Sequence, residues 1–399
     1  MDATLKRITL VTETFAPEIN GVANTLGHLV RGMLARGIEV QIIRPRQHRQ
    51  DDNRIQGQLH TVTLPGLPIP GYNQLKFGLP LQGRIAKALQ QFDPQAVYIA
   101  TEGPMGWAAA RAAGKQQRGI ISGFHTNFHQ YIEHYRLGAL EKPTYRYLRY
   151  FHNLTAGTLV PTRNQRDQLE RHGFNNVRVL ARGVDSDLFS PQKRSAELRR
   201  QWGVRDDDLV LLYVGRIAGE KNMALALATY RQLQQADERV RLVLVGDGPE
   251  LENIRQQQPE IICCGMQRGE QLAQHYASGD VFLFPSKTDT FGNVVTEAMA
   301  SGLAVVSFDY AAAHEHISSG DNGLLAPYGD DQAYIQHAET LLDSPNLLKR
   351  LRQQARQTAR TIAWDSIVEE FISRLSSAQT EVSRHGKRKT NARKSSATV

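Results

Sequence analysis

The chain has 399 residues, too many for one ordinary domain and enough for two of roughly 180 residues each. Apolar residues make up 41% of it, a globular composition that can bury two cores, and no apolar run approaches the roughly 20 residues that cross a bilayer. Lys6-Arg7 is followed by only a short apolar run, residues 8–11, which argues against a signal peptide. We therefore expect a cytoplasmic protein.

The first half of the sequence alternates predicted strands with predicted helices. Strands are expected at residues 8–11, 40–43, 96–100, 119–124 and 158–161, with helices at 22–36 and 105–115. A Pro/Gly-rich loop is expected between Leu64 and Pro80. This alternation predicts a parallel sheet with helices on both faces.

The same pattern restarts in the second half. Strands are expected at 209–214, 241–245, 281–284 and 303–307, with helices after Lys221, from about Glu250 and after Gly292. The predicted fold class is α/β, with two doubly wound domains in tandem. We expect domains at 1–188 and 189–362, a C-terminal helix at 363–378, and a basic, disordered tail at 379–399. Ligands bind beyond the carboxyl ends of strands in such sheets, so a cleft between the domains is the expected active site.

Residues 286–302 carry the strongest chemical signal. A predicted strand ends, Gly292 lets the backbone approach a ligand, and a helix begins, whose first N–H groups favour phosphate. Asp289 could hold sugar hydroxyls, and Glu297 could accept hydrogen bonds from a ribose. Alternatively, the two acids are a charge pair favoured by the dipole at the helix start.

Two cations follow the first strand of the second half. Arg216 ends that strand and Lys221 lies five residues further on. Both could reach a diphosphate, Arg216 by bidentate pairing and Lys221 as a point charge. The alternative is a pair of solvated cations in a loop.

Two positions stand out in the first half. Gly21 precedes a helix and suits close approach by a phosphate or a sugar, although no G-x-G-x-x-G fingerprint occurs there. His125 follows a strand, where a reacting group would be needed. His125 and His129 have i, i+4 spacing but lack the glutamate of a zinc motif, so we expect no metal site. Asp185-Ser186-Asp187 has the D-x-D form but is interpreted as a turn.

Together, these residues resemble the family-4 retaining glycosyltransferases of the GT-B fold, over roughly residues 7–376. The resemblance is carried by Gly215-Arg216 with Lys221, by Val245-Gly246-Asp247-Gly248-Pro249, and by 289–302. The last segment matches the family's carboxylate-x7-Glu motif, with Asp289 where many members have Glu. The resemblance implies two Rossmann-like domains that face each other across a cleft, and a C-terminal helix that crosses back to the first domain.

The resemblance also implies a role for each position. Arg216 and Lys221 would hold the donor diphosphate, while Asp289 and His125 would contact the transferred sugar. The implied donor-binding residues are Gly21, Phe291, Gly292, Asn293 and Glu297, together with Met266, Gln267 and Arg268, whose backbone would meet the base. The acceptor-side candidates are Glu102, Tyr131, Tyr135 and Lys142.

Three shorter segments refine the resemblance. Residues 101–104, 124–128 and 289–292 look like GDP-mannose-dependent mannosyltransferases of glycolipid synthesis, and also like relatives that use UDP-sugars on diacylglycerol. We expect a hexose, preferably mannose from GDP-mannose, to pass to a lipid or glycan acceptor. The expected mechanism is a front-face reaction with retention that needs no metal or other cofactor. The alternative donor is a UDP-sugar.

Two features of the sequence, residues 131–151 and the basic tail, each have more than one possible role. Residues 131–151 are rich in Tyr, Arg and His, which is typical either of a membrane-interface surface or of ordinary helix packing. Part of the net charge of +8 lies in the tail, which is either solvated or weakly attached to acidic phospholipid or to nucleic acid. A lipid contact would be at the inner face of the cytoplasmic membrane. A nucleotide-sugar epimerase would share the architecture. We expect no nucleic-acid partner, because much of the excess charge lies in the tail.

Overall fold

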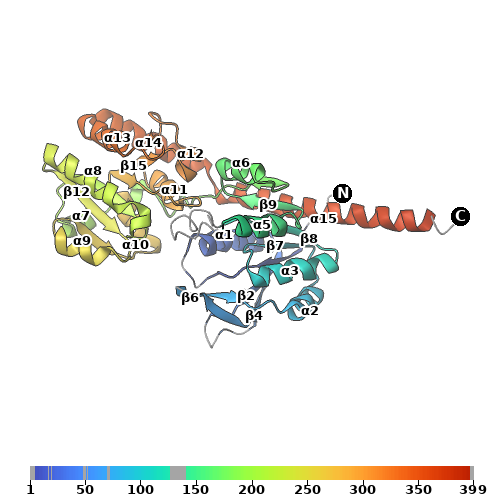
Figure 1. Cartoon of the computed structure of the whole chain (residues 1–399). Coiled ribbons are helices and arrows are strands. Elements are labelled where there is room, and N and C mark those ends of the chain that lie inside the picture. The colour runs from blue at the N-terminus through green and yellow to red at the C-terminus, as the bar shows by residue number, and fades with distance from the viewer. Residues whose placement is uncertain are drawn as a thin grey trace. The chain divides into compact units, whose positions relative to one another are not determined.

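The computed structural model describes residues 5–16, 18, 20–47, 51, 53–69, 72–125 and 141–395. The chain divides into two compact units, the first made of 1–182 with 364–399 and the second of 183–363. In each unit, helices cover both faces of a mostly parallel sheet (Figure 1). The prediction of two doubly wound α/β domains is therefore confirmed. The second unit begins at Gly183, before the predicted start at residue 189.

The first unit is built around an eight-stranded sheet of order β10-β9-β8-β7-β1-β2-β4-β3. Its strands are β1 (Arg7–Val11), β2 (Glu39–Pro45), β3 (Arg54–Gln56), β4 (Leu59–Leu64), β7 (Ala96–Ile99), β8 (Gly119–Gly123), β9 (Gly157–Val160) and β10 (Val177–Val179). Its helices are α1 (Gly21–Ala35), α2 (Gln82–Phe92), α3 (Pro104–Lys115), α5 (Glu141–His152), α6 (Arg163–Arg171) and α15 (Trp364–Ser395). The chain adds strands outward from β1 in one direction and from β7 in the other. The topological switch point of this sheet therefore lies between β1 and β7.

The predicted Pro/Gly-rich loop contains a β-hairpin instead. Strands β5 (Gly66–Ile69) and β6 (Tyr72–Gly78) pair antiparallel in a sheet of their own. Pro68 lies in β5, and proline is tolerated there because both strands of a two-stranded sheet are edges. The prediction was wrong because it read proline and glycine as loop signals without considering an edge strand.

The second unit holds a six-stranded parallel sheet of order β13-β12-β11-β14-β15-β16. Its strands are β11 (Leu209–Val214), β12 (Val240–Val245), β13 (Ile262–Gly265), β14 (Val281–Phe284), β15 (Ala304–Phe308) and β16 (Leu324–Ala326). Its helical segments are η2 (Pro191–Lys193), α7 (Ala196–Gln201), η3 (Gly219–Lys221), α8 (Met223–Ala236), α9 (Leu251–Gln257), α10 (Gly269–Ser278), α11 (Asn293–Ala300), α12 (Ala311–His316), α13 (Asp331–Asp343) and α14 (Pro345–Thr361). Here the switch point lies between β11 and β14.

The last helix, α15, belongs to the first unit although it follows the second unit in the chain. The indole of Trp364 stacks on His28 with ring centroids 4.4 Å apart. Further along, the Gln379 side chain accepts a hydrogen bond from the Gly119 N–H at 3.0 Å. The predicted return of the C-terminal helix to the first domain is therefore confirmed.

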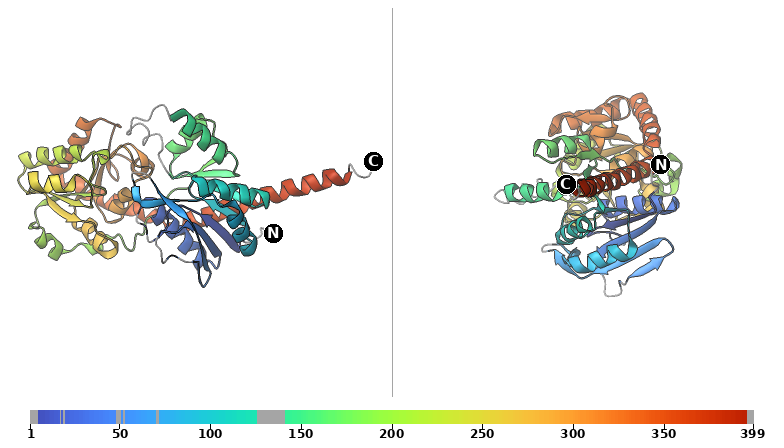
Figure 2. Two further views of the ribbon diagram at one scale, coloured as in Figure 1. Left: turned by 60° about the horizontal axis from the view of Figure 1, so that its bottom comes forward. Right: turned by 90° about the vertical axis from the view of Figure 1, so that its right-hand side faces the viewer.

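The helix does not end where the sequence suggested. We expected it to stop near residue 378 and a disordered tail to follow, but α15 continues to Ser395 and projects beyond the body of the first unit (Figure 2). The extension contains no proline and is rich in Arg and Lys, which have good helix propensities. In the part of the chain that the structure describes, no helix is long and apolar enough to cross a membrane.

Candidate functional site

In the second unit, the two loops at the switch point carry the residues that were predicted to bind the diphosphate and the sugar. Arg216 and Lys221 follow β11, and Asp289 follows β14. The Lys221 ammonium lies 2.9 Å from Asp289 Oδ1, and each side chain is only about one-fifth exposed. The structure therefore joins two residues that are far apart in the sequence into one partly shielded ion pair.

Two more hydrogen bonds hold these loops together. Asn222 Nδ2 donates to the carbonyl of Pro285 at 3.2 Å, and Thr288 Oγ1 donates to the carbonyl of Glu220 at 2.9 Å. The loops after β11 and β14 therefore form one connected surface at the carboxyl ends of both strands.

Arg216 forms its ion pair with Glu220 and not with the residues of the Lys221–Asp289 pair. Its guanidinium is 2.8 Å from a carboxylate oxygen of Glu220, and its side chain is 52% exposed. The hydroxyl of Tyr213 donates to the Arg216 carbonyl at 2.8 Å and fixes the backbone there. A donor diphosphate would have to compete with Glu220 for this guanidinium.

The start of α11 has the form expected of an anion site. Gly292 is its N-cap with φ of 85°, a left-handed conformation that favours glycine, and no side chain caps the helix there. A Cβ at this position would lie 2.9 Å from the Phe284 ring. Asn293, half-buried, is the first helical residue. The ring of Phe291 is 1% exposed and packs in the core, so it anchors the loop and leaves only its backbone for a ligand.

Glu297 lies one turn into α11 and accepts a hydrogen bond from Tyr276 Oη at 2.9 Å. Burial raises the pKa of Glu297 to about 7, although the hydrogen bond from Tyr276 lowers it. The sequence predicted Glu297 but missed Tyr276, because their contact joins α10 to α11 and leaves no local pattern.

The residues predicted to meet the base lie at the edge of the second sheet. Met266, Gln267 and Arg268 follow β13, which is separated from β11 by β12. Met266 is 55% exposed, and Gln267 Nε2 donates to the Cys264 carbonyl at 2.8 Å. Arg268 is the exposed N-cap of α10. Their role in base binding stays a prediction.

The glycines of the segment 245–249 serve backbone packing. A Cβ at Gly246 would lie 1.9 Å from the Gly215 carbonyl oxygen, and one at Gly248 would lie 2.2 Å from the Ile217 carbonyl oxygen. Both glycines therefore let the loop after β12 press against the loop that carries Arg216.

In the first unit, His125 follows β8 and contacts β7. Its Nε2 lies 2.8 Å from the hydroxyl of Tyr98, and a Cβ at Gly123 would come within 2.1 Å of that hydroxyl. Burial lowers the pKa of His125 to about 3, and the charge of Arg182 lowers it further. The imidazole is therefore neutral at physiological pH. Its contact with the transferred sugar stays a prediction.

Gly21 is the first residue of α1, as predicted, but this helix start is already capped. The side-chain oxygen of Asn20 accepts hydrogen bonds from the N–H groups of Val22 and Ala23 at 3.1 and 2.9 Å. A phosphate here would bind through Gly21 itself or displace Asn20. Arg182, 5% exposed, places Nη1 3.5 Å from the position of a Cβ on Gly21. This buried cation at the carboxyl end of β10 was missed by the sequence reasoning, although its place after a strand was a usable signal.

The acceptor-side candidates are only partly described. Glu102 follows β7 and is 5% exposed, and the Tyr147 hydroxyl donates to its backbone carbonyl. Lys142 lies exposed on α5. Tyr131 and Tyr135 lie outside the described residues.

The Asp185-Ser186-Asp187 segment forms a turn. Asp185 Oδ1 accepts hydrogen bonds from the N–H groups of Asp187 and Leu188 at 3.2 and 2.9 Å, which is the turn chemistry predicted for this segment. Among the described residues, no group of three or more His, Cys, Asp and Glu is placed to hold a metal ion.

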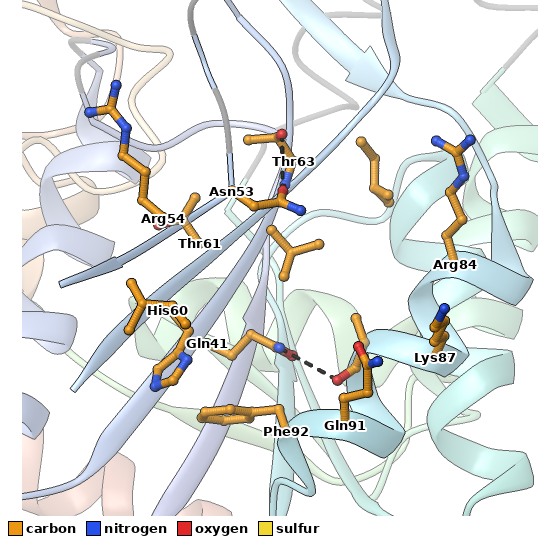
Figure 3. Close-up of a pocket in the computed structure, with 14 residues that line it drawn as sticks. Gln41, Asn53, Arg54, His60, Thr61, Thr63, Arg84, Lys87, Gln91 and Phe92 are labelled. Atoms are coloured by element: carbon orange, nitrogen blue, oxygen red, sulfur yellow. Dashed lines mark hydrogen bonds between the residues drawn. The ribbon is translucent and has the colours of Figure 1, made fainter. Parts of the chain in front are cut away.

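A groove of about 520 Å³ lies between the β3–β4 pair and α2 of the first unit (Figure 3). Arg54 and His60 line it from the strands, and Arg84 and Lys87 line it from the helix. None of the predicted site residues lines this basic groove, so it shares no side chain with the sites at the strand ends.

The sequence matches two family models, one for each half. Residues 19–188 match "Glycosyltransferase Family 4" and residues 194–358 match "Glycosyl transferases group 1". A GDP-mannose-dependent alpha-mannosyltransferase of Corynebacterium glutamicum is 32% identical over 341 residues, 84% of this chain and 81% of that protein. The chain belongs to glycosyltransferase family 4. It is a hexosyltransferase that moves a sugar from a nucleotide-sugar donor to an acceptor.

Two other similarities set this family-4 glycosyltransferase in a wider group. An alpha-monoglucosyldiacylglycerol synthase of Streptococcus pneumoniae is 26% identical over 354 residues, 86% of this chain and 79% of that protein. The crystal structure of Anabaena HepE in complex with UDP and glucose has a TM-score of 0.72 at 18% identity, and the match covers 94% of this chain and 100% of that chain. At that identity the likeness shows the fold, which is GT-B.

Proposed function

We propose that this glycosyltransferase transfers mannose from GDP-mannose to a hydroxyl of a lipid acceptor, with retention of anomeric configuration. The main support is the 32% identity, over 84% of the chain, to a relative named for GDP-mannose. The diacylglycerol product named for the streptococcal relative supports a lipid acceptor. The second candidate is transfer from a UDP-sugar, which the UDP bound to HepE favours.

The second unit would bind the donor through the switch-point loops. Lys221, Arg216 and the start of α11 would stabilise the negative charge that grows on the diphosphate as the bond to the anomeric carbon breaks. Preorganised groups of this kind are each worth roughly 3 kcal/mol of activation free energy. Asp289 positions the Lys221 ammonium and would accept hydrogen bonds from sugar hydroxyls.

The chemistry would follow a front-face course. The acceptor oxygen attacks the anomeric carbon on the face from which the diphosphate leaves, and the acceptor proton passes to the departing phosphate oxygen. The two cations would supply the charge that a magnesium ion supplies elsewhere. We therefore expect full activity in the presence of EDTA, and loss of activity on chelation would refute a metal-free reaction.

A lipid acceptor would place the reaction at a membrane surface. The formal net charge of +8, with basic residues concentrated between 384 and 394, would favour anionic lipid. We propose peripheral contact with the inner face of the cytoplasmic membrane, tested by flotation with anionic and with neutral liposomes. Failure to float with anionic liposomes would count against this contact.

The experiment for the function compares donors at fixed acceptor. The purified full chain is incubated with GDP-mannose or UDP-glucose, with and without dioleoylglycerol or its monoglucosyl derivative in mixed micelles. We expect a mannosylated lipid with an α linkage from GDP-mannose, identified by NMR. An inverted linkage would contradict retention, and conversion of a nucleotide sugar to its epimer without acceptor would indicate an epimerase instead.

A further inference from the structure

Two glutamates meet at the switch point of the first sheet. Glu13 comes two residues after the end of β1, and Glu102 comes three residues after the end of β7. The Glu13 N–H donates to Thr101 Oγ1 at 3.0 Å, which ties the two strand ends together. Ligands of open α/β sheets bind at this position. The sequence reasoning singled out Glu102 and overlooked Glu13.

The Glu13 carboxylate lies directly against the start of α3. A Cβ on Gly103 would lie only 2.3 and 2.4 Å from its two oxygens, so a side chain there would displace the carboxylate. Hydrogen bonds from the backbone N–H groups of Gly78 and Met105 also reach it. Glu13 is therefore held in place by two segments of backbone, the end of β6 and the start of α3.

Each of the two carboxyl groups keeps one oxygen without a partner. Oε1 of Glu13 and Oε1 of Glu102 are buried, and no hydrogen-bond donor within the described residues reaches them. The whole Glu102 residue is 5% exposed. Buried polar atoms are nearly always hydrogen-bonded, so such a pair at a ligand position indicates that a ligand supplies the missing partners.

Burial favours the protonated, neutral form of the Glu13 and Glu102 carboxyl groups. Burial raises the pKa of Glu13 to about 7 and that of Glu102 to about 8, and the Glu13 charge raises the latter further. The groups that face them are the hydroxyls of Tyr147 and Tyr98, whose pKa values are also raised by burial. The charge of Arg182 lowers the pKa values of Tyr98 and His125, and no cation is among the causes that shift the pKa of either glutamate. At neutral pH the pair therefore holds about one proton.

A carboxyl pair with one proton offers both a donor and an acceptor, which is what a hydroxyl group needs from its site. We propose that Glu13 and Glu102 bind the hydroxyl groups of an uncharged polyol, a sugar or a glycerol, in the acceptor, and that they discriminate against a phosphate at that position. This inference rests on the proposed function for the acceptor's part in the reaction. It makes Glu13 a further specificity-determining residue.

The direct test measures polyol binding without transfer. Binding of methyl α-mannoside and of mannose 6-phosphate is followed by NMR titration of the full chain with no donor present. We expect the neutral sugar to bind more tightly than the phosphate. Glu13→Gln should weaken the neutral sugar about tenfold, since it removes one charge-assisted hydrogen bond. Glu39→Gln, the same change at the amino end of β2, is the matched control and should bind as wild type does.

A pH profile distinguishes two roles for Glu13, binding of the acceptor hydroxyl groups or only structural support of the start of α3. In the wild type, kcat/KM for the acceptor should fall as the pH rises through 7 to 8, because the pair loses its last proton. In Glu13→Gln the amide keeps a donor at every pH, so this alkaline limb should flatten. GDP binding should be unchanged in the variant, which shows that it is folded.

The outcomes distinguish this inference from the proposed function. Equal sugar binding and equal alkaline limbs in wild type and Glu13→Gln would overturn the inference, as would preferred binding of the phosphate. Weaker sugar binding in Glu13→Gln together with no transfer from GDP-mannose would support the inference and reject the proposed donor. Gly103→Ala should reproduce the loss of sugar binding by displacing the Glu13 carboxylate.

Discussion

Lys221 and Asp289 form an ion pair within the proposed donor site. The pair is about one-fifth exposed, so its attraction is stronger than that of a surface pair and fixes the direction of the ammonium. An incoming diphosphate would share this ammonium and leave Asp289 oxygens for sugar hydroxyls. The aspartate is one methylene shorter than glutamate, and the structure shows that it still reaches Lys221.

We expect Lys221→Ala to lower kcat by about 10² to 10³, because it removes one preorganised cation from the developing diphosphate charge. Lys221 lies at the end of the short helical segment η3, outside the apolar core, so the circular dichroism spectrum should be unchanged. Lys193→Ala is the control, since Lys193 forms an ion pair with Glu270 at 2.7 Å on α10. A kcat for Lys221→Ala close to that of the control would remove Lys221 from the mechanism.

A single sequence shows local spacing but not contacts between distant elements. Asp289 and Glu297 stand at a fixed spacing after a strand, so the sequence could single them out, and their roles stay predictions. Tyr276 and Glu13 act through contacts between elements that are distant in the chain, and no spacing in one sequence reports such contacts. The Asn20 cap on α1 differs from these contacts, because asparagine before a helix is a local N-cap signal that the sequence does carry.

At the scale of elements, the start of α11 decides how the donor loop is shaped. Gly292 provides a left-handed turn directly against Phe284, so the chain leaves β14, carries Asp289 and enters the helix within a few residues. Gly329 offers a comparison, because its φ of 86° is almost the same and nothing lies within 4 Å of a Cβ built on it.

Gly292→Ala should cost more stability than Gly329→Ala and should weaken GDP binding. The left-handed conformation alone costs roughly 1–2 kcal/mol in a non-glycine residue, and only Gly292→Ala adds a collision with the Phe284 ring. Urea denaturation and calorimetric titration with GDP measure the two effects. Equal losses in both variants, with GDP affinity unchanged, would show that the shape of this loop does not matter for the donor.

Strands could be predicted from the sequence where they are buried on both faces along their whole length. Strand β11 is apolar along its length because a central parallel strand is covered on both faces, and the sequence shows this as a continuous run. The β5–β6 hairpin and the far end of α15 were not predictable in this way. Both depend on weak local preferences that compete with loop signals, rather than on a buried face.

For the whole molecule, buried titratable groups set the dependence of stability on pH. Three carboxyls have folded pKa values of about 7 to 8, well above the ordinary 4.5; they belong to Glu13, Glu102 and Glu297. Three imidazoles have folded pKa values of about 3 to 4, below the ordinary 6.5; they belong to His125, His152 and His316.

We expect the melting temperature to fall as the pH rises from about 6.5 to 8. In this window the folded histidines are neutral and the unfolded ones lose their last protons, while the folded chain still holds more carboxyl protons than the unfolded chain has bound in all, so raising the pH favours unfolding. Between about pH 4.5 and 6.5 the two sets act in opposite directions and largely offset each other. Scanning calorimetry at a series of pH values checks this, and a melting temperature that rises between pH 6.5 and 8 would contradict it.

The most direct measurement is calorimetric titration of the wild type and of Lys221→Ala with GDP, UDP and ADP under identical conditions. The proposed nucleotide-sugar site lies at the switch point of the second unit, with GDP-mannose as the donor. GDP should therefore bind most tightly, and Lys221→Ala should weaken its binding at least tenfold, about 1.4 kcal/mol. UDP binding as tightly as GDP would contradict the proposed donor, and GDP affinity unchanged in Lys221→Ala would contradict the proposed site.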